Sequence, residues 1–170
     1  MRKIFQKGYT LIELLITIGI IGLLLMIGVA TFGNYERQNN LILTADSLKS
    51  FVVGARADAK SRDLNLWEND KITKVVLEIT SDGLTINEYK YAGNVPYTDP
   101  GSTSPRVFRS FAVDKKINNL KDNGFKKIEI EVPSGEIIST LPLDISLNSS
   151  GDIVHLIVTK ESVYVGEKTF

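Results

Sequence analysis

The sequence predicts an α+β fold in which one long N-terminal helix packs on a C-terminal antiparallel β-sheet head. Residues 14–32 contain no charged side chain, and helical apolar spacing continues beyond them. Residues 63–170 instead break into short apolar runs separated by turn residues. The helix therefore has a membrane-length half and an amphipathic half, and the second half is expected to fold with the sheet.

The first half of the helix is long enough to span a membrane. Residues 14–32 carry only two threonines as polar side chains, and at ~1.5 Å per residue they reach about 28 Å. Three cations lie in residues 1–8, whereas Glu36 and Arg37 cancel after the apolar stretch. The positive-inside rule then places the N-terminus in the cytoplasm. We expect a single-pass membrane protein whose head lies outside the cytoplasm.

One carboxylate, Glu13, lies just inside this apolar helix. A charged group in a membrane helix costs up to about 3 kcal/mol and usually faces a protein partner. In the alternative reading, Glu13 complements the helix dipole in the first turn and reaches the membrane surface.

Residues 7–15, Lys-Gly-Tyr-Thr-Leu-Ile-Glu-Leu-Leu, resemble the processing site of type IV prepilins and type II secretion pseudopilins. The resemblance implies that a prepilin peptidase cuts between Gly8 and Tyr9 and methylates the new amine of Tyr9. A neighbouring subunit shifted along the fibre axis would bring its amine to Glu13, and this pairing would set the subunit register. Tyr9 departs from the family, in which the first mature residue is usually Phe.

The resemblance implies a pilin-like version of the α+β fold and a division of the chain into four parts. Residues 1–8 are the leader peptide, 9–33 the transmembrane and assembly helix, 34–62 its amphipathic half, and 63–170 a β-rich head that folds with 34–62. The implied partners are other pilin or pseudopilin subunits, the prepilin peptidase and methyltransferase, an inner-membrane assembly platform and, before assembly, the lipid bilayer. An uncleaved anchor presenting a binding domain is the alternative, and its chain would begin at Met1.

The amphipathic half of the helix is predicted by an apolar stripe with spacings of four, three, four, three and four. We expect the helix to run from about residue 10 to about residue 62, with bends at 33–34 or 38–40. Residues 51–62 are similar to the end of this helix in minor pseudopilins of the H type, which share an Ala-Arg-x-x-Ala pattern. Arg56 is then either a functional contact or, as we predict, solvated surface. The stripe consists of Leu41, Ala45, Leu48, Val52, Ala55 and Ala59.

Seven strands are predicted in the head, with turn residues at 81–83, 133–135 and 148–152. Alternating apolar residues at 75–79 and 128–132 predict faces that are buried against the helix stripe. Residues 92–105 are expected to form a long loop. The predicted strands are 74–80, 84–91, 107–113, 127–132, 143–147, 153–159 and 163–165.

The sequence contains no pattern that indicates catalysis or a cofactor. It has no cysteine and one histidine, His155, which is expected to be an ordinary sheet residue. No nucleophile elbow, phosphate loop or paired carboxylate pattern is present. Asp99 and Asp152 are too isolated to predict a calcium site. We therefore predict neither an enzyme nor a bound cofactor or metal.

A basic stretch in the head is the only signal for nucleic acid. The chain as a whole carries 20 basic and 20 acidic residues, so its net charge predicts no anionic partner. Phosphate contacts through the stretch would give salt-dependent DNA binding, although a solvated face balanced by acids elsewhere is the preferred reading. The stretch comprises Arg106, Arg109, Lys115, Lys116, Lys121, Lys126 and Lys127.

These patterns together predict a structural subunit of a type IV pilus-like fibre, specifically a minor pseudopilin of a type II secretion system. A minor pilin of a pilus or competence system, acting in adhesion or DNA uptake, is the alternative.

Overall fold

The computed structural model describes residues 9–61, 72–114, 116, 117, 120, 127–139 and 142–169, without the side chains of residues 28–31 and 167. Contacts within the chain divide it between Arg37 and Gln38 into two compact units. The first unit contains the apolar half of the long helix, and the second contains the amphipathic half together with every described strand.

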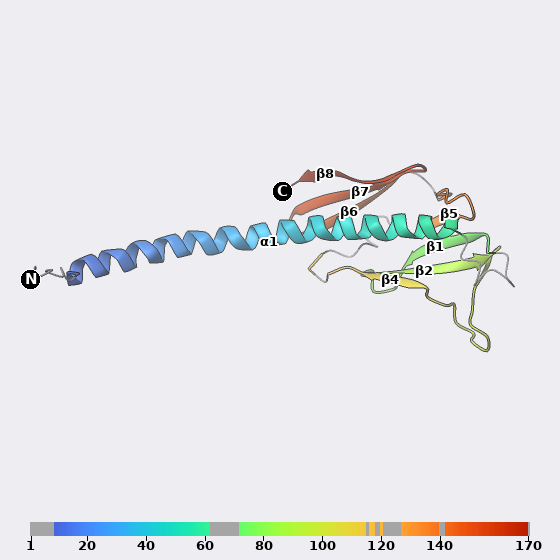
Figure 1. The fold of residues 1–170 in the computed structure, drawn as a ribbon, viewed down its shortest axis with the longest axis horizontal. Coiled ribbons are helices and arrows are strands. Elements are labelled where there is room, and N and C mark those ends of the chain that lie inside the picture. Colours follow the sequence, from blue (N-terminus) through green and yellow to red (C-terminus); the bar gives the residue numbers. More distant parts are fainter. Residues whose placement is uncertain are drawn as a thin grey trace, which may run out of the picture. The chain divides into compact units, whose positions relative to one another are not determined.

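One helix, α1 (Leu11–Ser61), forms the N-terminal part of the described chain (Figure 1). It confirms the predicted helix over about 10–62. The helix continues through residues 33–34 and 38–40, where the sequence had indicated bends. A glycine lowers helix propensity by about 1 kcal/mol relative to alanine, which weakens a long helix locally without ending it.

The predicted stripe of α1 is the helical contribution to the core of the second unit. Each of its six residues is at most 1% exposed. Residues between them on the opposite side, such as Asp46, Ser50 and Ala57, are exposed. The amphipathic pattern therefore identified the buried face of the helix correctly.

Five strands form the larger of two antiparallel sheets, which we call the large sheet. The strands are paired in the order β3-β2-β1-β5, and β4 also pairs with β2, so that β3 and β4 share one edge of β2. Their bounds are β1 (Lys74–Ile79), β2 (Thr85–Ala92), β3 (Val95–Pro96), β4 (Arg109–Ala112) and β5 (Lys127–Glu131).

The small sheet has three strands in the order β6-β7-β8, with bounds β6 (Leu143–Ser149), β7 (Asp152–Val158) and β8 (Val163–Thr169). All seven predicted strands are present, although β4 is shorter than predicted and β6 and β8 are longer. The α+β class, with the helix packed against antiparallel sheets, is therefore confirmed.

The core lies where both sheets meet the second half of α1. Figure 1 shows β6–β8 on one side of this part of the helix and β1, β2 and β4 on the other. Val75, Leu77, Ile128 and Ile130 of the large sheet are fully buried in the same cluster as the helix stripe. The small sheet contributes Ile145, Leu147, Val154, Leu156 and Val158. The predicted burial of alternating residues against the helix is confirmed.

The turn between β1 and β2 is held by one carboxylate. Asp82 accepts hydrogen bonds from the amides of Leu84 (2.9 Å) and Thr85 (3.3 Å) and from the hydroxyl of Thr80. These bonds, that of Thr80 first, hold the pKa of Asp82 below its usual value. Because the folded pKa is lowered, this contribution to stability is present above the unfolded pKa and is lost as the pH falls through the folded pKa.

The predicted loop at 92–105 is more regular than expected. It contains β3 and an antiparallel bridge between Thr98 and Pro105. At its tip, the Ser102 amide donates to the Asp99 carbonyl (2.9 Å), and Gly101 has a φ of 85° after Pro100. Pro followed by a glycine with positive φ is typical of a type II turn. Residues 97–106 therefore form a short hairpin, which we call the arm.

Candidate functional site

Thr10 caps the N-terminal end of α1, a role that was not predicted from the sequence. The Thr10 hydroxyl oxygen accepts a hydrogen bond from the Glu13 amide at 3.3 Å, and its carbonyl accepts one from the Leu14 amide at 3.2 Å. Thr10 is thus an N-cap, and the spacing Thr-x-x-Glu is that of a capping box. This spacing in the sequence could have identified it.

Glu13 lies in the first turn of α1, far from any cation that follows it in the helix. Residues 9–36 contain no Lys, Arg or His, and Arg37 is about 36 Å away at ~1.5 Å per residue. Residues 14–36 of the helix therefore supply no cation that could pair with the Glu13 carboxylate. Tyr9 is described and 81% exposed, whereas Gly8 lies outside the described residues.

The first half of α1 is an apolar rod with its side chains open. By length and composition the helix is apolar enough to cross a membrane, with a mean hydropathy of 2.6 over its most apolar 18 residues and none of that window buried. Large apolar side chains from Leu11 to Ile27 are all more than half exposed. Such a surface needs lipid or other helices around it, because water does not solvate an apolar helix on all sides.

The basic stretch of the head does not form one surface among the residues that the structure describes. Arg109 on β4 points toward α1, where it lies 3.6 Å from Asp58. Lys127 on β5 lies opposite Glu78 in the sheet register, on the other face of the large sheet. Lys115, Lys121 and Lys126 fall outside the described residues.

Arg109 is instead part of a charge cluster around the buried carboxylate of Glu88. Its Nε atom lies 2.7 Å from Oε2 of Glu88, whose side chain is 1% exposed. The guanidinium also lies over the ring of Phe51, with Cζ 5.2 Å from the ring centroid. Gly54 permits this approach, because a Cβ there would lie 2.9 Å from the guanidinium. Sequence reasoning missed Glu88, although its position two residues after the inward-facing Ile86 indicated the same buried face.

Two other members of the stretch form ion pairs with carboxylates. Arg106 lies 2.9 Å from Asp99 within the arm, and Lys127 pairs with Glu129. The backbone amide of Lys116 donates to the side chain of Asp114 at 2.9 Å, a bond that does not involve the ammonium group. The two ion pairs lower the attraction that Arg106 and Lys127 would exert on phosphate.

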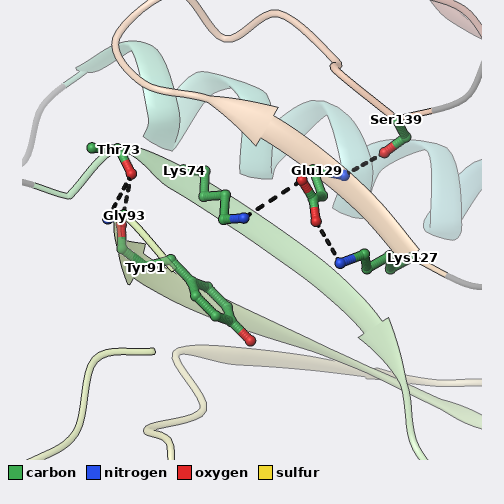
Figure 2. A network of polar contacts seen from close by, with 7 residues as sticks. All are labelled: Thr73, Lys74, Tyr91, Gly93, Lys127, Glu129 and Ser139. Atoms are coloured by element: carbon green, nitrogen blue, oxygen red, sulfur yellow. Dashed lines mark hydrogen bonds and ion pairs between the residues drawn. The ribbon is translucent and has the colours of Figure 1, made fainter. Parts of the chain in front are cut away.

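Glu129 of β5 connects two lysines on the outer face of the large sheet (Figure 2). Its carboxylate lies 2.5 Å from Lys127 and 3.6 Å from Lys74 of β1. The hydrogen bond from Lys127 is the main cause that lowers the pKa of Glu129, and burial opposes it. The same bond raises the pKa of Lys127. The network stabilises the β1–β5 pairing at neutral pH, and Glu129 loses its contribution in acid.

Arg56 is not solvated surface, which corrects the sequence-based interpretation. Its Nε atom donates to the Gly135 carbonyl at 3.1 Å, and its terminal nitrogens donate to the carbonyls of Glu161 (3.0 Å) and Lys160 (3.4 Å). One guanidinium therefore ties α1 to the turn after β5 and to the β7–β8 turn. A single sequence could not show this, since both turns are distant along the chain.

We predict that Arg56→Ala lowers the free energy of unfolding by about 2 kcal/mol, because it removes three charge-assisted bonds that are partly open to water. Arg56→Lys should recover less than half of this loss, since one ammonium cannot reproduce the fork. Urea unfolding of a fragment that begins at Gln38 would measure both variants. Equal stability of the lysine variant and the unchanged protein would contradict the role of the fork.

Of the remaining polar candidates, His155 and Asp99 each lie in a pair of side chains. His155 is a β7 residue, as predicted, and its Nδ1 lies 2.9 Å from the Asp144 carboxylate. Asp99 pairs with Arg106, and Asp152 is a buried residue at the start of β7. In the parts of the chain that the structure covers, no three His, Cys, Asp or Glu side chains are grouped to hold a metal.

Comparison with known proteins finds one relationship. Residues 5–29 match the family model of the prokaryotic N-terminal methylation motif. Searches of curated proteins and of solved structures find no match. The matched segment covers the capped helix start and Glu13, and it supports a type IV pilin-like subunit that assembles with other pilin subunits.

Proposed function

We propose that this chain is a subunit of a type IV pilus-like fibre, processed by prepilin peptidase after Gly8 and assembled through the first half of α1. The main support is the motif match at residues 5–29, which coincides with an apolar rod whose side chains are open along its described length. In the membrane, lipid would cover this rod, and in the fibre neighbouring helices would replace the lipid. The topology is N-terminus in the cytoplasm, with the head outside or in the periplasm.

Glu13 sets the subunit register in this proposal. Cleavage creates a cationic amine on Tyr9, and no cation lies on the same helix within about 36 Å after Glu13. The amine of a neighbouring subunit would supply the counter-charge. An unpaired charge in hydrocarbon costs up to about 3 kcal/mol, so the register that joins the two groups would be favoured.

Mass spectrometry of the mature chain tests the processing step. We expect a chain that begins at Tyr9 with a methylated amine, and Gly8→Val should leave the leader attached because the residue before the cut is changed. Replacement of Gly19 by alanine is the matched control, since a Cβ there meets nothing within 4 Å. A mature chain that begins at Met1 would instead indicate an uncleaved anchor with a binding domain.

The finer proposal is a minor pseudopilin of a type II secretion system. Its support is the resemblance of residues 51–62 to the helix end of H-type pseudopilins. In this helix segment Arg56 is the residue that binds both turns. A minor pilin for adhesion or DNA uptake is the rival, and the pairing of Arg106 and Lys127 with carboxylates gives that rival less electrostatic support.

A DNA-binding assay distinguishes a subunit for DNA uptake from a pseudopilin of a secretion system. We expect the fragment from Gln38 to show no binding to duplex DNA at low ionic strength, where phosphate contacts are strongest. Binding that weakens steeply with salt and is reduced by Arg106→Ala would favour uptake over secretion. Arg109 should not be used for this purpose, because its replacement is expected to damage the fold.

A further inference from the structure

Aromatic side chains mark both ends of the apolar rod. Tyr9 precedes α1 and is 81% exposed, while Phe32 and Tyr35 are 71% and 67% exposed at the other end. The charged residues Glu36 and Arg37 follow immediately. The rod therefore passes from aliphatic to aromatic to charged side chains within about one and a half helical turns.

The spacing of these aromatic residues matches a bilayer. Tyr9 and Tyr35 are 26 positions apart, which corresponds to about 39 Å of helix. A bilayer measures about 30 Å across its hydrocarbon and about 40–45 Å with its headgroups. Tyrosine concentrates at the headgroup level because its ring is apolar and its hydroxyl is polar.

We infer that Tyr35, supported by Phe32, docks the membrane-inserted subunit at the lipid headgroup boundary on the head side and thereby sets the depth of Glu13. This inference rests on the proposed function, since it concerns the subunit before it enters a fibre. Glu13 is 22 positions from Tyr35, or about 33 Å along the helix. With Tyr35 at one boundary of a hydrocarbon layer about 30 Å thick, Glu13 lies at the other boundary.

This placement explains how the apolar helix can carry the Glu13 carboxylate before the amine of a neighbouring subunit pairs with it. At the headgroup boundary, Glu13 keeps contact with water and avoids most of the cost of a charge in hydrocarbon. Tyr35 is thus a positioning residue, which acts on Glu13 through the continuous helix between them. Its partner is the interfacial zone of the bilayer, where an aromatic ring and a hydroxyl are both solvated.

Spin labels on the full-length chain test this depth. The sequence has no cysteine, so Leu14→Cys and Asn34→Cys each provide one unique labelling site near an end of the rod. The chain is placed in vesicles of phosphatidylcholine and phosphatidylglycerol. Collision of the label with oxygen and with a water-soluble nickel chelate then reports its depth.

The informative variant combines Tyr35→Ala with Asn39→Tyr, which moves the ring one helical turn toward the head. Asn39 is an exposed position, so the new ring has room. We expect the whole helix to shift by up to one turn, about 6 Å. The label at position 14 should then become more accessible to nickel and the label at position 34 less accessible. The control Leu43→Tyr, an exposed change two turns beyond Tyr35, should leave both labels unchanged.

Opposite shifts at the two labels would support positioning by Tyr35, because a general loss of order would move both labels in one sense. Unchanged depths, or shifts in the same sense, would overturn the inference while leaving membrane insertion intact. A third label, at Leu24→Cys in the middle of the rod, tests insertion itself. If this label is not immersed in lipid in the chain that keeps Tyr35, the inserted state in the proposed function is wrong, and the inference fails with it.

Discussion

Arg109→Ala is expected to lower the free energy of unfolding of the head by about 3 kcal/mol. Removing one member of a buried ion pair leaves the other charge without compensation, and such changes typically cost about 3–5 kcal/mol. Glu88 is 1% exposed and would lose the cation 2.7 Å from its Oε2. The lower end of the range applies because the Arg109 side chain is itself 38% exposed. Urea unfolding of the fragment from Gln38, which contains the whole described core, measures the change.

Two further variants make this prediction specific. Arg106→Ala removes a pair whose partners are 41% and 53% exposed. It should cost about 1 kcal/mol or less, as is usual for surface ion pairs. Replacing Glu88 and Arg109 together by leucine should recover most of the loss, since a buried pair exchanged for apolar side chains is often neutral. If Arg106→Ala and Arg109→Ala cost the same, the charge cluster around Glu88 would not have the role assigned to it.

Glu13→Ala is expected to abolish incorporation into fibres while leaving cleavage at Gly8 intact. The variant removes the carboxylate that we propose pairs with the Tyr9 amine of a neighbouring subunit. That amine would then remain charged and unpaired in an apolar helix bundle. A cost of about 3 kcal/mol corresponds to roughly a hundredfold loss of incorporation. Quantitative immunoblots of sheared fibres and of membranes, compared with the unchanged chain, measure this loss.

The controls for Glu13 separate its charge from its place in the helix start. Glu13→Asp keeps the carboxylate and should retain part of the incorporation, whereas Glu13→Gln keeps the shape and should behave like alanine. Thr10→Ala weakens the helix cap, typically by about 1 kcal/mol, without removing the charge. If Thr10→Ala and Glu13→Ala reduce incorporation equally, helix capping rather than charge pairing would explain the effect.

The parts of the fold that could be predicted are those that depend on the regular spacing of apolar residues along one helix or strand. The stripe from Leu41 to Ala59 named the buried face of α1 because residues three and four apart lie on one side of a helix. Alternation at 75–77 and 128–130 identified the inward sides of β1 and β5 in the same way. The paired structure within residues 92–105 was not predicted because β3 is only two residues long, and its pairing with β2 is not visible in composition.

The roles of the two arginines depended on contacts between distant segments. Arg56 looked like one more charge on a solvated helix face, yet it binds carbonyls 79 and 105 residues further along the chain. Arg109 looked like part of a basic stretch and instead pairs with Glu88, 21 residues earlier. Charge counted along a sequence does not show which face of a sheet each residue occupies or what lies against it.

The sequence alone therefore determined the membrane-length rod, the motif at its start and the buried stripe that continues it, because each depends on the order of neighbouring residues along one helix. The tertiary structure decided which cations of the head pair with a buried carboxylate, as Arg109 does, and which pair at its surface, as Arg106 does. That decision depends on the packing of β2 and β4 against α1, which buries Glu88 and makes Arg109 its counter-charge.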